Sequence, residues 1–297
     1  MPQQHPFAAV VALPRDDQAD RVGEPTAHGA LHWAPHHDDG YHARMQMLAQ
    51  WVADAQPQVC VVDVSVEVAL FLRLLGVPTV VFALPGDRTD APHEAVHRAA
   101  DHILAAWPAG LNTPRWLQPH THKTSYVGGI SRFEGRRPEH PGDDRELRIL
   151  VLGGAADVSG CRTGPDLPDV SWTAIGGASG RWVDDPWPYL CVADVVVSHA
   201  GQNSIADIAA AQRPAIVVPQ PRPFGEQDCT AAVLDRHALA TVTRGPVRDE
   251  DWPGLVHRAA RRDPAHWRRW QVHGAAARAA AAVEDTAVRC RSGAGRR

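Results

Sequence analysis

Short β-branched runs alternate with helical patterns from about residue 57 onward, and this alternation constrains the fold more than any other feature. Strands are predicted at 58–64 and 79–84, with an apolar helix at 66–75 between them that glycine and proline end. Residues 92–106 are predicted to form a helix with a strand-like tail. Strands that alternate with helices are typical of βαβ units and parallel sheets, so the predicted fold class is α/β.

A second alternating series follows a polar segment at 131–145 that is rich in glycine, proline and charge. Its short apolar runs predict strands at 147–152, 171–175, 195–198, 215–218 and 240–243. The remaining stretches predict helices at 203–211, 228–237 and 250–261, and a mostly alanine helix at 266–283. We therefore expect two open α/β domains joined by a linker, with ligands at the carboxyl ends of the strands.

Composition excludes several classes of protein. The net charge of −4 gives no general electrostatic case for binding nucleic acid or an anionic membrane. No apolar run reaches the length of a membrane-spanning helix, and the first residues lack the basic region of a signal peptide. The five cysteines are scattered without a CxxC pair, which indicates neither a disulfide framework nor a thiolate metal site. A reducing, cytoplasmic location is expected.

The strand at 195–198 runs into a tight turn that contains His199 and Gly201, and a helix follows. Backbone N–H groups at a helix N-terminus attract anions, and the dipole of the helix adds to this attraction. Asn203 and Ser204 supply further donors, while Asp207, one turn later, could accept from vicinal hydroxyls. The alternative is that Asn203 or Ser204 merely caps the helix.

Two more segments lie near the ends of predicted strands. The loop PQPRPFGEQ ends in Glu226 and Gln227, an acid and an amide that could bind neighbouring sugar hydroxyls. The alternative is an exposed proline-rich loop that leads into a helix N-cap. Upstream, Trp182 could cover a nucleobase whose edge the backbone of Val183 reads, although a tryptophan is more often a core residue.

Together, HAGQNS, Asp207 and the pair Glu226–Gln227 resemble the donor-binding signature of GT-B glycosyltransferases, and in particular of family 28. The resemblance is good over 147–283 and looser over 51–132. It implies two Rossmann-like domains with a cleft between them. It also implies a set of ligand contacts: Trp182 and Val183 for the base; His199, Gly201, Asn203 and Ser204 for the diphosphate; Gly153 and Gly154 for a loop facing the phosphates; Asp207 for the ribose; and Glu226 and Gln227 for the donor sugar.

The resemblance implies transfer of a hexosyl group from a nucleotide-diphosphate sugar, UDP-linked, to the hydroxyl of a small-molecule or lipid-linked acceptor. It implies no cofactor besides the donor substrate and no catalytic metal, and peripheral contact with a membrane is left open. The alternatives are a non-catalytic nucleotide-sugar binder and a UDP-sugar 2-epimerase of the same fold.

Family members open with a strand and a glycine-rich turn that bears a histidine, and the start MPQQHPFAAVVALPRDD does not match that element. The resemblance thus implies that the first domain lacks its opening unit, and no catalytic base can be named. The expected boundaries are a partial acceptor-side domain at 1–130, a linker at 131–146, a nucleotide-sugar domain at 147–265, and a segment at 266–297 whose helix packs back on the first domain before a polar tail.

Two groups of residues lie outside the signature. The run HWAPHHDDGYH contains His32, His36, His37 and His42 with Asp38 and Asp39, types that suit zinc or iron, but a solvated loop is favoured and no metal site is predicted. Asp63, Ser65 and Glu67 follow a predicted strand and are acceptor-side candidates. Simple helix capping explains these three residues equally well.

Overall fold

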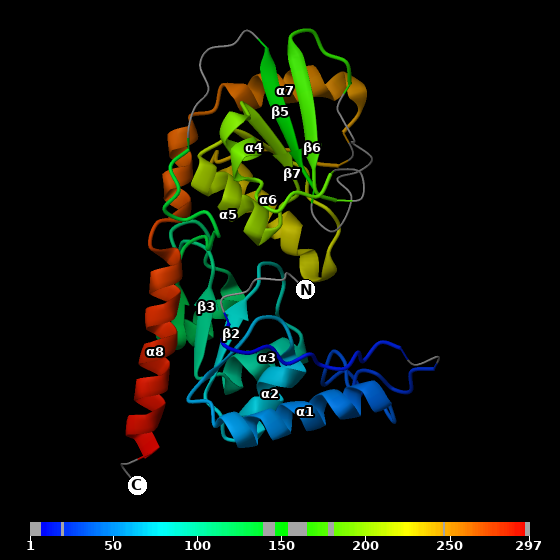
Figure 1. Ribbon diagram of the computed structural model, residues 1–297, viewed down its shortest axis with the longest axis vertical. Helices are drawn as coiled ribbons and strands as arrows, with labels where there is room; N and C mark the ends of the chain where they lie inside the picture. The colour runs from blue at the N-terminus through cyan, green and yellow to red at the C-terminus, as the bar shows by residue number, and fades with distance from the viewer. Residues whose placement is uncertain are drawn as a thin grey trace. The chain divides into compact units, whose positions relative to one another are not determined.

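The computed structural model describes residues 7–18, 21–138, 146–153, 165–177, 181–245 and 247–294, and the structural statements below concern these residues. Its named strands form two parallel sheets with the orders β1-β2-β3-β4 and β6-β5-β7-β8-β9 (Figure 1). The fold class is therefore α/β, as the alternating sequence pattern predicts.

The chain divides into two compact units, each described here by itself. The first consists of Met1–Val81, Thr89–Asp101 and Thr286–Arg297. The second consists of Phe82–Arg88 and His102–Asp285. The end of the last helix thus belongs to the first unit, where the Arg291 guanidinium donates to the Gln58 side chain at 2.6 Å.

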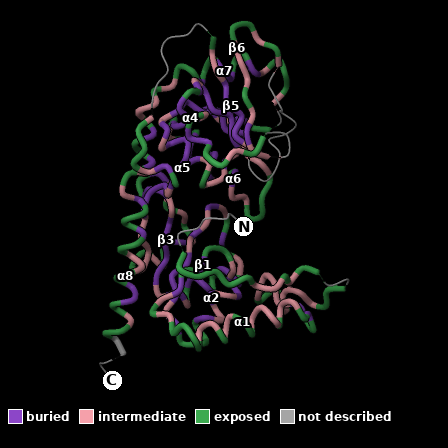
Figure 2. The backbone as a smooth tube through the Cα atoms, in the orientation of Figure 1, coloured by how far each residue is buried: buried purple, intermediate pink, exposed green. Residues whose placement is uncertain are grey.

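The first unit contains short strands and helices from the first half of the chain. They are α1 (Asp39–Ala55), β1 (Cys60–Val62), α2 (Val66–Leu74), β2 (Thr79–Ala83, whose end belongs to the second unit) and α3 (Ala91–Ala99). β1 and β2 pair in parallel with Cys60 opposite Thr79. No residue of α1 is buried, whereas β2 is almost wholly buried (Figure 2). The apolar core of this unit therefore lies around the strands, and α1 lies at its surface.

The second unit carries most of the strands. They are β3 (His102–Ala105), β4 (Thr124–Tyr126), β5 (Leu147–Leu152), β6 (Val170–Ile175), β7 (Val195–Ser198), β8 (Ala215–Val217) and β9 (Thr241–Val242). Its α-helices are α4 (Trp187–Val192), α5 (Gln202–Ala211), α6 (Glu226–Arg236), α7 (Trp252–Ala260) and α8 (Ala275–Ala294, whose end belongs to the first unit). Short 3-10 helices cover Arg115–Lys123, Pro223–Gly225, Asp249–Asp251 and Pro264–Trp270.

The central strands of the five-stranded sheet are buried on both faces. Alternate residues of a strand point to opposite faces, so Ile149, Val151 and Val195 share one face, which packs against Trp252 and Leu255 of α7. The intervening residues of the same strands are buried as well, on the face opposite α7. Burial on both faces explains why the central strands read as continuous apolar runs in the sequence.

Two predicted helices differ from the structure. The predicted helix at 92–106 ends at Ala99, because Ala100 turns to extended backbone and the N–H of Asp101 bonds to the carbonyl of Thr79 in β2. The strand-like tail predicted for this segment is confirmed as β3. The predicted helix at 266–283 is two elements, a 3-10 helix and α8. They are separated by Gln271 at φ 55° and Gly274 at φ 76°, which leave the right-handed helical region. The sequence analysis also missed α1, α4 and β4.

Candidate functional site

The order of the five strands points to one edge of the sheet. β5 lies between β6 and β7, so the chain leaves β5 towards one side and later returns on the other. In open α/β sheets, ligands bind in the crevice outside the carboxyl ends of the strands at such a switch point, which here lies at β5 and β7. Gly153 follows β5 and His199 follows β7, which places both predicted phosphate-side turns at this crevice.

Gly153 lies where two backbones approach closely. Its N–H donates to the carbonyl of Ile175 at 2.9 Å, and a Cβ at this position would lie 2.7 Å from the oxygen of Gly176. A side chain here would push the ends of β5 and β6 apart, so only glycine fits. The predicted neighbour Gly154 lies outside the described residues.

The turn after β7 fixes the imidazole of His199. The N–H of Gly201 donates to His199 Nδ1 at 2.9 Å, so the neutral ring carries its proton on Nε2. Ser204 Oγ lies 3.4 Å from that Nε2. Burial lowers the pKa of His199, and the positive charge of Arg222 lowers it further. The ring is thus a neutral N–H donor at the start of α5.

α5 begins without a side-chain cap. Its N-cap is Gly201, no side chain bonds to the first turn in the described part of the chain, and Asn203 is exposed. The capping alternative for Asn203 and Ser204 is therefore wrong. The first N–H groups of a helix have no partners within the helix, so these remain available to an anion together with both side chains.

Asp207 lies one turn further along α5 and is largely buried, with 8% of its surface exposed. Ser131 Oγ donates to its Oδ1 at 2.7 Å, and Arg132 Nε lies 3.6 Å from Oδ2. Burial raises the pKa of Asp207, and the Ser131 and Arg132 contacts oppose that rise. A segment that the sequence analysis assigned to the linker therefore holds this carboxylate in place.

Gln227 connects the ends of two strands. Its side-chain oxygen accepts from the N–H of Ala200, after β7, at 3.1 Å and from the N–H of Gln220, after β8, at 2.9 Å. The residue is 5% exposed. The oxygen is thus used within the fold, and only the amide N–H groups remain to meet a sugar hydroxyl.

Glu226 opens α6 and forms an ion pair with the guanidinium of Arg88. Arg88 is buried, donates to the carbonyl of Pro85 at 3.0 Å and lies over the ring of Phe224 at 4.5 Å. The loop before α6 is exposed from Pro221 to Phe224, as the alternative of an exposed proline-rich loop expects, and it is anchored at its charged end by this ion pair.

Trp182 is 79% exposed, so the alternative of a core tryptophan is wrong. Val183 beside it is half-buried. Sequence reasoning missed Arg222, Arg88 and Ser131. Arg222 stands inside the loop PQPRPFGEQ, where its charge was a usable signal, whereas only the tertiary structure brings Arg88 and Ser131 to their partners.

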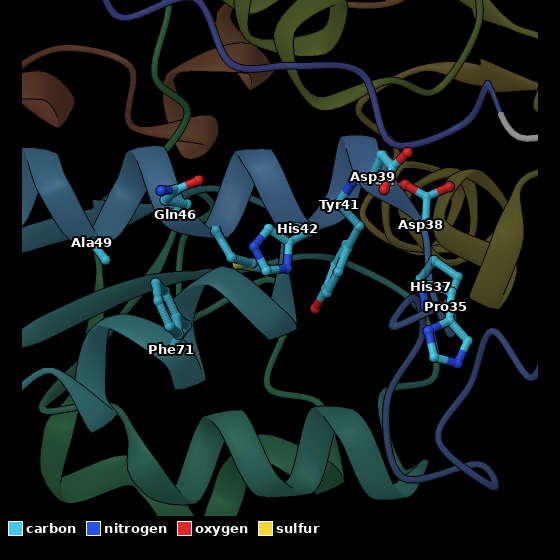
Figure 3. Close-up of a pocket in the computed structure, with 10 residues that line it drawn as sticks. Pro35, His37, Asp38, Asp39, Tyr41, His42, Gln46, Ala49 and Phe71 are labelled. Atoms are coloured by element: carbon cyan, nitrogen blue, oxygen red, sulfur yellow. Dashed lines mark hydrogen bonds between the residues drawn. The ribbon is translucent and has the colours of Figure 1, made fainter.

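Several cavities lie away from these two turns in the described part of the chain, and two of them are described here. One, of about 870 Å³, lies on the β9 side of the loop before α6 and includes Arg222, Asp228 and Arg244 in its lining. The other, of about 550 Å³, lies in the first unit, where α1 directs Tyr41 and His42 towards α2, which carries Phe71 (Figure 3).

The acceptor-side candidates have structural contacts in the first unit. Ser65 caps α2 by accepting from the N–H of Val68 at 3.2 Å, which supports the capping alternative for this residue. Glu67 Oε1 accepts from the N–H groups of His32 and Trp33 at 2.8 and 3.1 Å. Asp63 is exposed.

From Asp39 onward the histidine-rich run belongs to helix α1, whereas the sequence analysis favoured a solvated loop. Asp38 is buried and caps α1 by accepting from the N–H of Tyr41 at 2.6 Å. His32 instead meets two residues that the sequence analysis did not connect with it, Asp90 and His93. One potential ligand atom from each of these three residues lies within 4.8 Å of the other two.

Among the described helices, none has the length and apolarity that crossing a membrane requires.

Residues 181–250 match the model of the glycosyltransferase family 28 C-terminal domain. The chain is 30% identical over 183 residues to the "UDP-N-acetylglucosamine--N-acetylmuramyl-(pentapeptide) pyrophosphoryl-undecaprenol N-acetylglucosamine transferase" of Sorangium cellulosum. This match covers 52% of this chain and 44% of the relative. It is 27% identical over 219 residues to the protein of the same name from Rubrobacter xylanophilus, covering 60% of this chain and 62% of the relative. The matches thus span about half the length of these curated relatives. Among solved structures, MurG of Acinetobacter baumannii superposes with a TM-score of 0.57 at 15% identity, over 84% of this chain and 80% of that one.

Proposed function

We propose that this chain, which has the GT-B fold and a family 28 C-terminal domain at residues 181–250, transfers a hexosyl group from a UDP-linked sugar to an acceptor hydroxyl. The family match covers the start of α5, the loop before α6 and the exposed Trp182. The two curated relatives are named for transfer of N-acetylglucosamine from a UDP-linked donor to a lipid-linked acceptor, which supports these substrate classes. A cytoplasmic location is part of the same proposal.

The observation that carries the proposal is the start of α5. An uncapped helix N-terminus and the Nε2–H of a neutral His199 lie after the central strand β7, and the positive charge of Arg222, from the loop after β8, acts on His199. These groups complement two negatively charged phosphates without a metal ion of their own. Asn203 and Ser204 add side-chain donors at the same end.

In the proposed reaction an acceptor oxygen forms a bond to the anomeric carbon while the bond from that carbon to the diphosphate oxygen breaks. The acceptor proton passes to a base, and the electron pair of the broken bond leaves with UDP. The donors at α5 stabilise the negative charge that develops on the leaving diphosphate, and the bound geometry aligns the reacting atoms.

The remaining contacts are proposed by analogy with the family. Trp182 and Val183 contact the base, Gly153 and Gly154 face the phosphates, and Asp207 binds the ribose. Glu226 and Gln227 bind the donor sugar, Gln227 through its amide N–H groups because its oxygen serves the fold. On the acceptor side, the exposed Asp63 is the more available candidate, because Ser65 and Glu67 already hold backbone groups.

The test is thermal unfolding of the chain with UDP in the presence of a chelator. Ligand at 100 times its Kd stabilises the folded state by about 2.7 kcal/mol, so the melting temperature should rise without any divalent metal. A rise that requires added Mg²⁺ or Mn²⁺, or no rise at millimolar UDP, contradicts the proposal. Conversion of a UDP-sugar in the absence of any acceptor would instead indicate the alternative function, a UDP-sugar 2-epimerase.

A glycine pair supplies the matched variants. A Cβ on residue 201 would lie 2.5 Å from His199 Cε1, so Gly201→Ala displaces the imidazole. A Cβ on Gly110 meets nothing within 4 Å. Because a hydrogen bond to a charged partner contributes about 1.5–3 kcal/mol, Gly201→Ala should weaken UDP binding about 10-fold or more. Gly110→Ala should leave UDP affinity unchanged, and equal affinities for both variants would remove the His199 contact from the site.

A further inference from the structure

Three side chains in the first unit converge from two distant parts of the chain. His32 Nε2 lies 2.6 Å from Asp90 Oδ2, and His93 Nδ1 lies 2.5 Å from Asp90 Oδ1. The rings of His32 and His93 have centroids 4.6 Å apart. Each oxygen of one carboxylate thus faces a different imidazole.

Asp90 occupies the N-cap position of α3 but makes no side-chain cap there. An aspartate at an N-cap normally accepts from a backbone N–H of the first turn. Here the carboxylate turns instead to the two histidines, 58 and 3 residues away in the sequence. The local structure thus gives up a helix cap in order to assemble this cluster.

The loop that presents His32 is held independently of the cluster. Glu67, buried at the start of α2, accepts from the backbone N–H groups of His32 and Trp33. The indole N–H of Trp33 in turn donates to the carbonyl of Asp16 at 3.0 Å. On the other side, His93 lies on the buried face of α3 beside His97, with ring centroids 5.9 Å apart. Both histidines are therefore positioned by groups outside the cluster.

We propose that His32, Asp90 and His93 bind a zinc ion, at a site that does not depend on the proposed nucleotide-sugar site. Two imidazoles and one carboxylate form a ligand set that zinc prefers, and three protein ligands leave a fourth position for water or another ligand. Zn–N and Zn–O bonds of about 2.0–2.2 Å place the ligand atoms of a tetrahedral site roughly 3.4 Å apart, so donors already within 4.8 Å of one another need only small shifts.

The surroundings also permit entry of the ion. His32 and Asp90 are about one-third exposed, at 31% and 33% of their side chains, while His93 is 10% exposed. The ion would take the place of the direct contacts between Asp90 and the two rings, and it would tie the loop around His32 to the start of α3. The sequence analysis predicted no metal site, because it considered His32 only with its neighbours at 36–42.

The experiment uses the whole chain without an affinity tag, dialysed against a chelator and then titrated with zinc chloride by calorimetry. We expect one zinc per chain and a higher melting temperature with zinc. In His93→Gln the affinity should fall more than about 100-fold, since changing even the groups that orient metal ligands costs 10–100-fold. His32→Gln should show the same loss of zinc affinity. If circular dichroism shows that His93→Gln does not fold, His32→Gln tests the zinc site instead.

His266→Gln is the matched control. His266 and Asp263 have the same i, i+3 spacing as His93 and Asp90, with His266 Nε2 3.9 Å from the carboxylate. This variant should bind zinc like the wild-type chain. Failure of the wild-type chain to bind zinc, or equal zinc affinity in the wild type, His93→Gln and His32→Gln, would overturn the proposal. UDP affinity measured in a chelator should be the same for all of these chains, which separates this site from the proposed function.

Discussion

The two units surround their polar side chains differently. In the second unit, Gln227 and Asp207 are buried, and their oxygens accept from groups whose positions the fold has fixed. In the first unit, His32 and Asp90 are partly exposed, and the Asp90 carboxylate contacts both His32 and His93. A buried polar group that loses its partner costs free energy, so the contacts of Gln227 and Asp207 hold one geometry. In the cluster of the first unit, the partly exposed His32 and Asp90 remain accessible to an incoming ion.

The polar side chains of the second unit hold loops in place, whereas those of the cluster around Asp90 are themselves potential ligands. The crevice at β5 and β7 offers backbone N–H groups at the start of α5 because side chains such as Gln227 fix the neighbouring loops. The cluster around Asp90 offers side-chain donors directly. An anion suits the first arrangement and a cation suits the second. Three measurements test this contrast.

The largest expected effect comes from Gln227→Leu, which keeps the size of the side chain but removes its acceptor. The N–H groups of Ala200 and Gln220 then lose their partner, and an unsatisfied buried group costs about 1–3 kcal/mol. We expect the free energy of unfolding in urea to fall by about 2–4 kcal/mol. Gln118→Leu, at an exposed position, should change it by no more than about 0.5 kcal/mol. Similar losses in the two variants would show that Gln227 does not hold the loops.

A smaller effect is expected for Ser65→Ala in the first unit. Loss of the cap on α2 costs about 0.5–2 kcal/mol, while Ser65→Thr keeps an accepting hydroxyl and should retain most of the stability. Urea unfolding of both variants measures the difference. If both variants are as stable as the wild type but transfer sugar more slowly, Ser65 acts on the acceptor and the capping interpretation is wrong.

The smallest effect is the pH dependence that His199 adds. Its pKa in the folded chain is lowered by burial and by Arg222, so the unfolded chain binds the proton more readily. The stability that neutral His199 contributes is therefore complete above the unfolded pKa, about 6.5, and is lost as the pH falls towards the folded value. Urea unfolding from pH 8 to 5 should show the wild type losing stability relative to His199→Gln. If the difference in unfolding free energy between the wild type and His199→Gln stays constant over this pH range, the pKa of His199 is not lowered by folding.

Local patterns in the sequence predicted the strands of the five-stranded sheet to within a residue or two, and its central strands β7 and β8 read as apolar runs because they are buried on both faces. They also predicted the turn after β7, where the shift from strand to helix and the order His199, Gly201, Asn203 are contiguous. The helix at 266–283 was predicted wrongly because its alanine-rich composition hides the left-handed backbone at Gln271. α1 was missed because its apolar side chains are not buried and leave no clear periodicity.

The sequence by itself determined the parallel α/β class, the family 28 signature and the residue types at the start of α5. It did so because strand alternation, turn chemistry and helix capping depend on residues a few positions apart. Only the tertiary structure decided that Gln227 bonds to Ala200, that Ser131 holds Asp207, and that Asp90 and His93 meet His32. These pairs lie 27, 76, 58 and 61 residues apart, and side-chain contacts over such separations follow from the packing of sheets and helices, which no local pattern encodes.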